Sequence, residues 1–455
     1  MIAPFSARKN PAWAQRLTLT TELTPTDSGK TVGWRQGEDE SCAKQTTCEG
    51  AVLDDMPPED QLCLLLCRAE PSPVERKHTL ELLAYPLSWH AVLERAKIHG
   101  ITPLLYRNLH TLDFRGVPEP VRAKLADAFG TNSIRNALLA QELVRVLSLL
   151  DEAGVPVMPL KGVALAESLY GDPALRVCAD IDILVPTRYA THAFRLILSS
   201  GYEAPFTHPS LVDLLARYGK DCGLVRQDRT CVYPLQLHCG TIWGGPLEQD
   251  LLEEIWSEAS RKPFRGVAAF ALSEDWEFLY LAVHAARHGL FPLKWLVDLD
   301  RLCSRGKVDW EKVKEKARRL GWEKAVQSSL SACASLLDTR VQPLFCGTNS
   351  RLPARLPTAG PSALQIPKET LFVARLLRSR SRRFRFLAIR LLVPTAADCQ
   401  FLPLPSSLFF LYYPLRPFRL ACAVGSWLVQ AGWSVLRKKA KVRGVKDEGW
   451  KADEG

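Results

Sequence analysis

Two aspartates stand one residue apart inside an apolar segment, residues 178–185, whose sequence is CADIDILV. Side chains alternate between the two faces of a strand, so as a strand this segment places Asp180 and Asp182 on one face and its isoleucines on the other. Two carboxylates this close repel each other, and leaving them unpaired near a core is costly. The segment therefore predicts a strand whose acidic face needs a cation or basic partners, and a divalent metal held by Asp180 and Asp182 meets that need.

A Lys-Gly pair lies upstream of the two acids. Lys161 and Gly162 separate a short strand-like stretch, residues 155–160, from a helical run, residues 163–170. The N-terminus of a helix attracts anions through its free N–H groups and its dipole, so this turn is a candidate phosphate site with Lys161 as an added positive charge. Arg176, just before the acids, can either pair with them or bind a phosphate.

Polar side chains on two later elements are further candidates for lining the site. The strand-like stretch CVYPLQLHCG, residues 231–240, places Gln236 and His238 on one face, where His238 is either site-lining or a hydrogen-bonded structural residue. His284 and His288 are four residues apart on a predicted helix, a spacing that can hold zinc. The glutamate of an HExxH zinc motif is missing, so a structural or substrate-facing role is favoured for His284.

The hydrophobic pattern divides the chain into six segments, of which the first lacks any sustained apolar period and is predicted to be disordered. Because the helical pattern starts directly after Met56, we hypothesise that Met56 is the natural start of translation. The six segments are a disordered extension (1–56), a helical lead-in domain (57–153), an α/β core (154–245), a helical domain (246–345), a linker rich in Pro, Gly and Ser (346–363) and a basic, aromatic-rich tail (364–455).

The net charge of +10 favours an anionic partner such as a nucleotide, a nucleic acid or an anionic membrane surface. The charge is concentrated in the tail, where seven arginines and no acid lie between Arg375 and Arg390. An anionic partner at this tail is one interpretation, and a solvated helix face is the structural alternative.

Neither a secretory signal nor a transmembrane span is visible in the sequence, and the thirteen cysteines form no CxxC pair. This cysteine usage is typical of reduced thiols, so we expect a cytoplasmic location. The sequence also lacks a GxSxG motif and a Walker lysine loop, which argues against serine hydrolases and P-loop enzymes.

Taken together, these motifs resemble a family, the uncharacterised bacterial nucleotidyltransferases of the polymerase-β-like superfamily. The resemblance rests on PLKGVALAESLYGDPALRVCADIDILV, on LQLH and on LAVHAARHGLFPLKWLVDLDRL, and it covers residues 58 to 335 approximately. It implies an α+β fold in which a small mixed-sheet nucleotidyltransferase core is flanked by N-terminal and C-terminal helical regions.

The resemblance also implies a reaction. Asp180 and Asp182 become the ligands of Mg²⁺, or Mn²⁺, on a nucleoside triphosphate, and Lys161 and Gly162 take the place of the superfamily's Gly-rich phosphate turn. A nucleoside monophosphate then passes to an unidentified acceptor hydroxyl, and pyrophosphate is released.

One position departs from the superfamily pattern, which usually adds a third carboxylate on a later strand. Here the matching position is Gln236, which brings no charge, although Asp221 and Asp228 are nearby in the sequence. Two alternatives therefore stay open. Beside the nucleotidyltransferase that the resemblance implies, the chain could be a catalytically inactive nucleotide-binding or scaffold protein, or a protein that docks on a membrane or a nucleic acid through its Arg-rich tail.

Overall fold

The computed structural model describes residues 55–206, 209–218, 221–239, 249–341, 355–358, 365–376, 380–422 and 425. All of them belong to one compact unit, residues 50–455. The predicted N-terminal extension, most of the predicted linker and the end of the tail from residue 426 lie outside the described residues. The predicted start at Met56 and the segment boundaries stay predictions.

Helices form the part of the unit that precedes the sheet. The longest of them is α5, in which Leu139, Leu143 and Leu147 recur at helical spacing and are buried against the sheet. These helices are α1 (Pro58–Leu66), α2 (Pro73–Leu83), α3 (Trp89–His99), α4 (Thr102–Thr111) and α5 (Glu119–Glu152).

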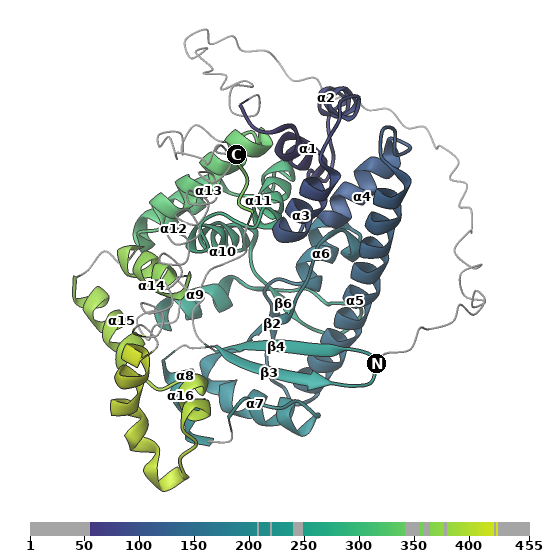
Figure 1. Cartoon of the computed structure of the whole chain (residues 1–455). Helices are drawn as coiled ribbons and strands as arrows, with labels where there is room; N and C mark the ends of the chain where they lie inside the picture. The colour runs from purple at the N-terminus through teal and green to yellow at the C-terminus, as the bar shows by residue number, and fades with distance from the viewer. Residues whose placement is uncertain are drawn as a thin grey trace, which may run out of the picture. The chain divides into compact units, whose positions relative to one another are not determined.

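The sheet at the centre of Figure 1 is mixed, with its strands in the order β1-β2-β4-β3. Strand β2 runs antiparallel to β1 and parallel to β4, and β3 pairs with β4 as an antiparallel hairpin. The strands of the sheet and the helices between them are β1 (Met158–Pro159), α6 (Val163–Tyr170), η1 (Pro173–Leu175), β2 (Ile181–Leu184), η2 (Thr187–Tyr189), α7 (Ala190–Ser199), α8 (Pro209–Arg217), β3 (Cys222–Gln227) and β4 (Val232–His238). The α+β fold with a small mixed sheet is therefore confirmed.

The two faces of the sheet belong to two different hydrophobic cores. Ile181, Ile183 and Leu235 pack with α5 and α7 on one face, whereas Leu184 of the opposite face packs with the later helices. This alternation follows from the period of two in a strand, and it turns Asp182 toward the same side as Leu184. The acidic face of β2 is thus enclosed between the sheet and the helices that follow it.

Helices return after the sheet, interrupted by a small hairpin of two-residue strands. The sequence predicted a helical domain over residues 246–345, and it did not indicate this hairpin. The later elements are α9 (Gln249–Glu258), β5 (Ser260–Arg261), β6 (Phe270–Ala271), α10 (Glu274–Arg287), α11 (Lys294–Ser304), α12 (Trp310–Leu320), α13 (Glu323–Leu337), α14 (Gln365–Leu376), α15 (Arg380–Leu392), α16 (Ala396–Phe401) and η5 (Ser406–Leu411). Within the described ranges, no helix is both long enough and apolar enough to cross a bilayer.

Candidate active site

The Lys-Gly turn connects β1 to α6 and lies directly against Asp180. Gly162 precedes the first residue of α6 with a φ of 69° and a ψ of −136°, a conformation that side chains with a Cβ rarely adopt. A Cβ at this position would come within 3.0 Å of the carbonyl oxygen of Asp180. A glycine is therefore required both by the backbone conformation and by the close approach of the acidic strand.

Asp182 is the buried centre of the site, with 2% of its surface exposed. Its Oδ1 atom accepts from Lys161 Nζ at 3.2 Å and from His238 Nε2 at 3.0 Å. Burial favours the neutral acid, but His238 and Lys161 outweigh it and hold the pKa of Asp182 below its ordinary value. The Oδ2 atom of the same carboxylate is buried and has no hydrogen-bond partner among the residues that the structure describes. Asp182 is thus an ionised carboxylate with one oxygen still to be satisfied.

His238 is held between two carboxylates. Its Nδ1 atom lies 2.7 Å from Asp221, which directly precedes β3 and is brought to His238 by the hairpin register. Although burial lowers the pKa of the imidazole, the charge of Asp221 and the bonds to Asp182 and Asp221 raise it to about 10. His238 is therefore an imidazolium that bridges the two acids.

Of the two acids that the sequence offered near Gln236, the structure brings only Asp221 to this network. Asp228 lies at the tip of the β3–β4 hairpin, where it accepts from the backbone N–H groups of Thr230 and Cys231. Gln236 itself is paired with Asp182 in the β2–β4 register, and its amide group packs over Gly223.

Asp180 lies at the start of β2 and is only partly buried. Burial and the charge of Asp182 raise the pKa of Asp180, while Lys161 and Lys294 act in the opposite direction. The described residues contain no group of three or more His, Cys, Asp or Glu side chains placed to hold a metal. Two carboxylates and the unsatisfied Oδ2 of Asp182 nevertheless fit Mg²⁺, because this ion is usually held by one or two carboxylates together with water and substrate phosphates.

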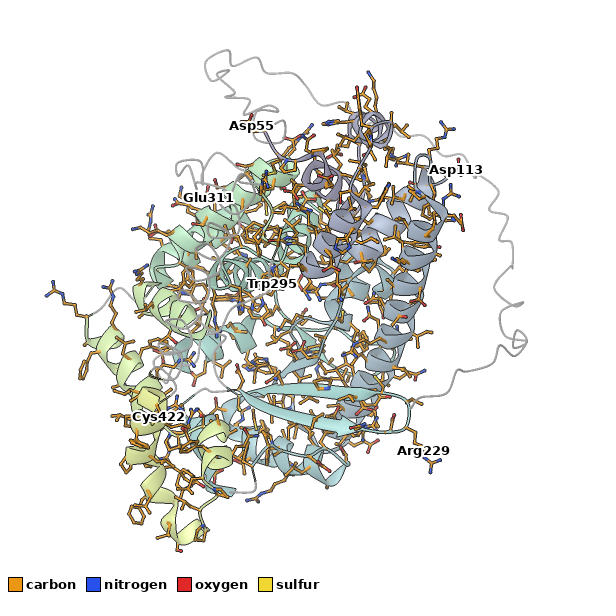
Figure 2. All side chains as sticks on the ribbon, in the orientation of Figure 1. Asp55, Asp113, Arg229, Trp295, Glu311 and Cys422 are labelled. Carbon is orange, nitrogen blue, oxygen red and sulfur yellow. The ribbon has the colours of Figure 1, made fainter. Side chains whose placement is uncertain are left out.

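Aromatic side chains of α10 and α11 form a wall beside these charges. The ring centroid of Trp295 lies 4.8 Å from those of both His284 and His288, and the two histidine rings are 4.7 Å apart. Burial, and next the charge of Lys161, hold the pKa of His284 well below its ordinary value, so His284 is a neutral imidazole near the Lys-Gly turn. Trp295 is labelled near the middle of the view in Figure 2.

Arg176 pairs with an acid other than the two that the sequence suggested. Its guanidinium is buried and donates to Asp298 of α11, from Nε at 2.9 Å and from Nη2 at 2.8 Å. Asp298 also accepts from the hydroxyl of Tyr170 at 2.8 Å. The expected pair between Arg176 and Asp180 or Asp182 is therefore wrong, and the guanidinium is engaged in linking the core to α11.

Sequence reasoning also missed two residues near the site, Tyr280 and Lys294. The ring centroid of the buried Tyr280 lies 6.0 Å from that of His284, and burial and the charges of Asp182 and Asp221 raise the pKa of Tyr280 well above its ordinary value. Lys294 donates to the carbonyl of Val177 at 3.1 Å, and burial lowers its pKa to about 8. A signal for this wall was present in the sequence, because Tyr280 shares the four-residue spacing of His284 and His288.

Comparisons with known proteins agree with the family resemblance. A family model described as "Uncharacterised nucleotidyltransferase" matches residues 85–338, which is more than half of the chain. Among solved structures, an antigenic nucleotidyltransferase-like protein from Paracoccidioides brasiliensis is 14% identical, with 45% of this chain and 94% of that chain covered and a TM-score of 0.30. The search of curated proteins found no match. The chain belongs to the family of uncharacterised nucleotidyltransferases.

Proposed function

We propose that this protein transfers a nucleoside monophosphate from a nucleoside triphosphate to an acceptor hydroxyl and releases pyrophosphate. Asp180 and Asp182 would hold Mg²⁺ or Mn²⁺, which when bound supplies positive charge to the triphosphate. The observation that carries the proposal is the buried, partnerless Oδ2 of Asp182 beside the Lys161-Gly162 turn. A buried anionic oxygen is costly unless a partner satisfies it, and a metal is such a partner.

The protein's own contribution is positioning and charge. Lys161 lies between Asp182 and the start of α6, so its ammonium can pass from the carboxylate to an incoming phosphate without leaving the site. The first N–H groups of α6 directly follow Gly162 and would add donors for phosphate oxygens. Transfer of this kind depends mainly on such positioned charges.

The aromatic wall supports a place for the nucleobase. The rings of Trp295, His284 and His288 lie close to one another, and Lys161 acts on the neutral imidazole of His284. Bases stack on aromatic faces with little dependence on sequence. A triphosphate held by Lys161 and the acids would thus place its base against Trp295.

The test is pyrophosphate release from each of the four nucleoside triphosphates, with Mg²⁺ or Mn²⁺ and a cytosolic extract as the source of acceptor. We expect release from the wild-type protein and none from the Asp180→Ala, Asp182→Ala double variant. The matched control is Asp113→Asn, which changes an exposed carboxylate outside the sheet at a position of positive φ that asparagine tolerates. Figure 2 labels Asp113. Equal release by the double variant and the wild type would refute the proposal.

A second candidate is a protein that binds a nucleotide without catalysing transfer. It is favoured by Gln236 at the position of the third carboxylate and by the engagement of Asp221 with His238. This candidate predicts metal-assisted nucleotide binding that requires Asp182, together with no pyrophosphate release above the double variant.

A further inference from the structure

Helix α15 has two apolar stripes on opposite sides. Phe386, Ile389 and Val393 form a buried stripe that continues just beyond the helix. A second stripe has the same spacing and is open to solvent, with exposed fractions of 76% for Phe384, 41% for Leu387 and 48% for Leu391. At 100° per residue, the centres of the two stripes lie on opposite faces of the helix. The protein core therefore uses only one of the two apolar faces of α15.

The exposed stripe belongs to a larger apolar region. Twelve of the seventeen exposed large apolar side chains among the described residues lie between Leu371 and Phe418, so this exposure is concentrated in one region of the chain. They include phenylalanines such as Phe401 and Phe410. Many side chains of this yellow-green part of the chain stand out from the ribbon in Figure 2. Exposed large apolar side chains that gather in one region of the chain are typical of an interaction site.

The same region is strongly cationic. Residues 370–422 contain nine arginines and one acid, Asp398. Asp398 is buried and is already bound by Arg416 at 2.7 Å and Arg419 at 2.6 Å. On α15, the exposed Arg380 lies one turn before Phe384, and the exposed Arg385 follows Phe384 directly. Arginines thus border the apolar stripe, and no exposed acid of the region competes for them.

We propose that residues 380–418 dock on an anionic lipid surface through the exposed face of α15. Phenylalanine and leucine side chains would enter the boundary between headgroups and acyl chains, and arginines would meet the lipid phosphates. A nucleic acid would satisfy the arginines but would leave Leu387 and Leu391 without an apolar partner. A second copy of the chain would bring the same positive charge to the contact and would be repelled.

The test uses the full chain and flotation with phosphatidylcholine vesicles that either contain or lack phosphatidylglycerol. We expect binding to the anionic vesicles to be roughly tenfold or more tighter than to the neutral ones, and to weaken with salt. The Phe384→Asp, Leu391→Asp double variant should lose about tenfold or more of this binding. The matched control is Val74→Asp on α2, because Val74 is also 76% exposed and lies outside the tail region.

A charge variant separates the contribution of the arginines from that of the apolar side chains. Arg380→Gln with Arg385→Gln should weaken binding to the anionic vesicles and leave binding to the neutral ones unchanged. Equal binding of the Phe384→Asp, Leu391→Asp variant and the wild type would overturn the proposal, as would equal binding to both kinds of vesicle. Retention on RNA without vesicle binding, or a dimer that this variant converts to a monomer without vesicle binding, would assign the surface to those partners instead. Pyrophosphate release plays no part in any of these outcomes.

Discussion

Asp298 and Asp182 are two buried carboxylates that face cations, yet the hydrogen bonding of their oxygens differs. Both oxygens of Asp298 accept hydrogen bonds, from Arg176 and from Tyr170, and all three side chains are largely removed from solvent. Asp182 uses one oxygen for both Lys161 and His238 and leaves the other without a partner. The first arrangement is closed, and the second has room for one more positive group.

Whether both oxygens of the carboxylate have partners separates a structural ion pair from a candidate site more clearly than charge or burial does. A buried pair is tolerated when its geometry is good and its remaining lone pairs are satisfied, and then it has no capacity for a ligand. A carboxylate with an unsatisfied buried oxygen retains that capacity at a cost in stability. The two aspartates should therefore respond in opposite ways to mutation, with stability lost at Asp298 and function lost at Asp182.

The largest expected effect on stability is that of Asp298→Asn. It leaves the buried guanidinium of Arg176 without its counter-charge, and breaking such a pair typically costs about 3–5 kcal/mol. Asp182→Asn should cost less than half of this, because Asp221 still faces His238 and Lys161 can turn toward solvent. Urea denaturation at pH 7 measures both free energies of unfolding. Similar losses for the two variants would mean that the site is as closed as the structural pair.

Gly162→Ala should affect stability and the site together. The added Cβ would meet the carbonyl of Asp180 at 3.0 Å in a conformation with positive φ, and the strain should cost about 2–3 kcal/mol. Because the strain falls on Asp180, metal-dependent nucleotide binding should weaken as well. Gly171 at the other end of α6 is the matched control, since its φ is 72° and a Cβ there would meet nothing within 4 Å.

Gly171→Ala should therefore cost only the backbone strain, about 1 kcal/mol, and should leave nucleotide binding unchanged. Calorimetric titration with a Mg²⁺-nucleoside triphosphate, next to urea denaturation, separates the two effects. Equal binding by both glycine variants would show that the approach of Gly162 to Asp180 does not shape the site.

The open site could be predicted from the sequence to a large extent because its parts are local. The alternation around Asp182 and the strand-turn-helix unit at Lys161 and Gly162 depend on neighbouring residues, and the helix occupies the predicted residues 163–170. The alternation of side chains along a strand was enough to predict which face of β2 carries Asp182. The fold class with its small mixed sheet came from the family resemblance, and the order of helical and strand-like stretches agreed with it.

The closed pair could not be predicted, because Arg176 and Asp298 are 122 residues apart in the chain. Proximity to Asp180 in the sequence suggested a partner that tertiary packing did not supply. Asp221 reaches His238 only through the register of the β3–β4 hairpin, which the sequence did not specify. The hairpin of β5 and β6 has strands of two residues, too short for a periodic pattern to reveal.

A third acid, the half-buried Glu277 of α10, extends the comparison to a carboxylate whose pKa is set mainly by its own burial. It lines a cavity of about 330 Å³ between β1, α6 and the β5–β6 hairpin, and burial raises its pKa to about 7 despite the charge of Lys262. Because the folded state holds this proton more tightly than the unfolded state, stability should rise as the pH falls from about 8 toward 5. Asp182 has a lowered pKa and contributes nothing in that window.

The titration of Glu277 should make the free energy of unfolding larger at pH 5.5 than at pH 8, by on the order of 1–3 kcal/mol. Glu277→Gln should remove this part of the difference between the two pH values. The measurement is urea denaturation of both proteins at the two pH values, so that other titrating groups cancel in the comparison. An unchanged difference would mean that Glu277 has a counter-charge in solution.

The smallest expected effect tests whether base recognition at the aromatic wall is separable from the charged site. Trp295→Leu removes the stacking face and should weaken binding of a Mg²⁺-nucleoside triphosphate by roughly tenfold, about 1.4 kcal/mol. Trp295→Phe keeps an aromatic face and should retain most of the affinity. Inorganic tripolyphosphate lacks a base, so its Mg²⁺-dependent binding should be the same in all three proteins. If Trp295→Leu weakened both ligands equally, the wall would support the fold of the site rather than the base. If neither ligand required Asp182 for binding, the oxygen of Asp182 that lacks a partner would not mark a ligand site, and Asp182 would not differ from Asp298 in function.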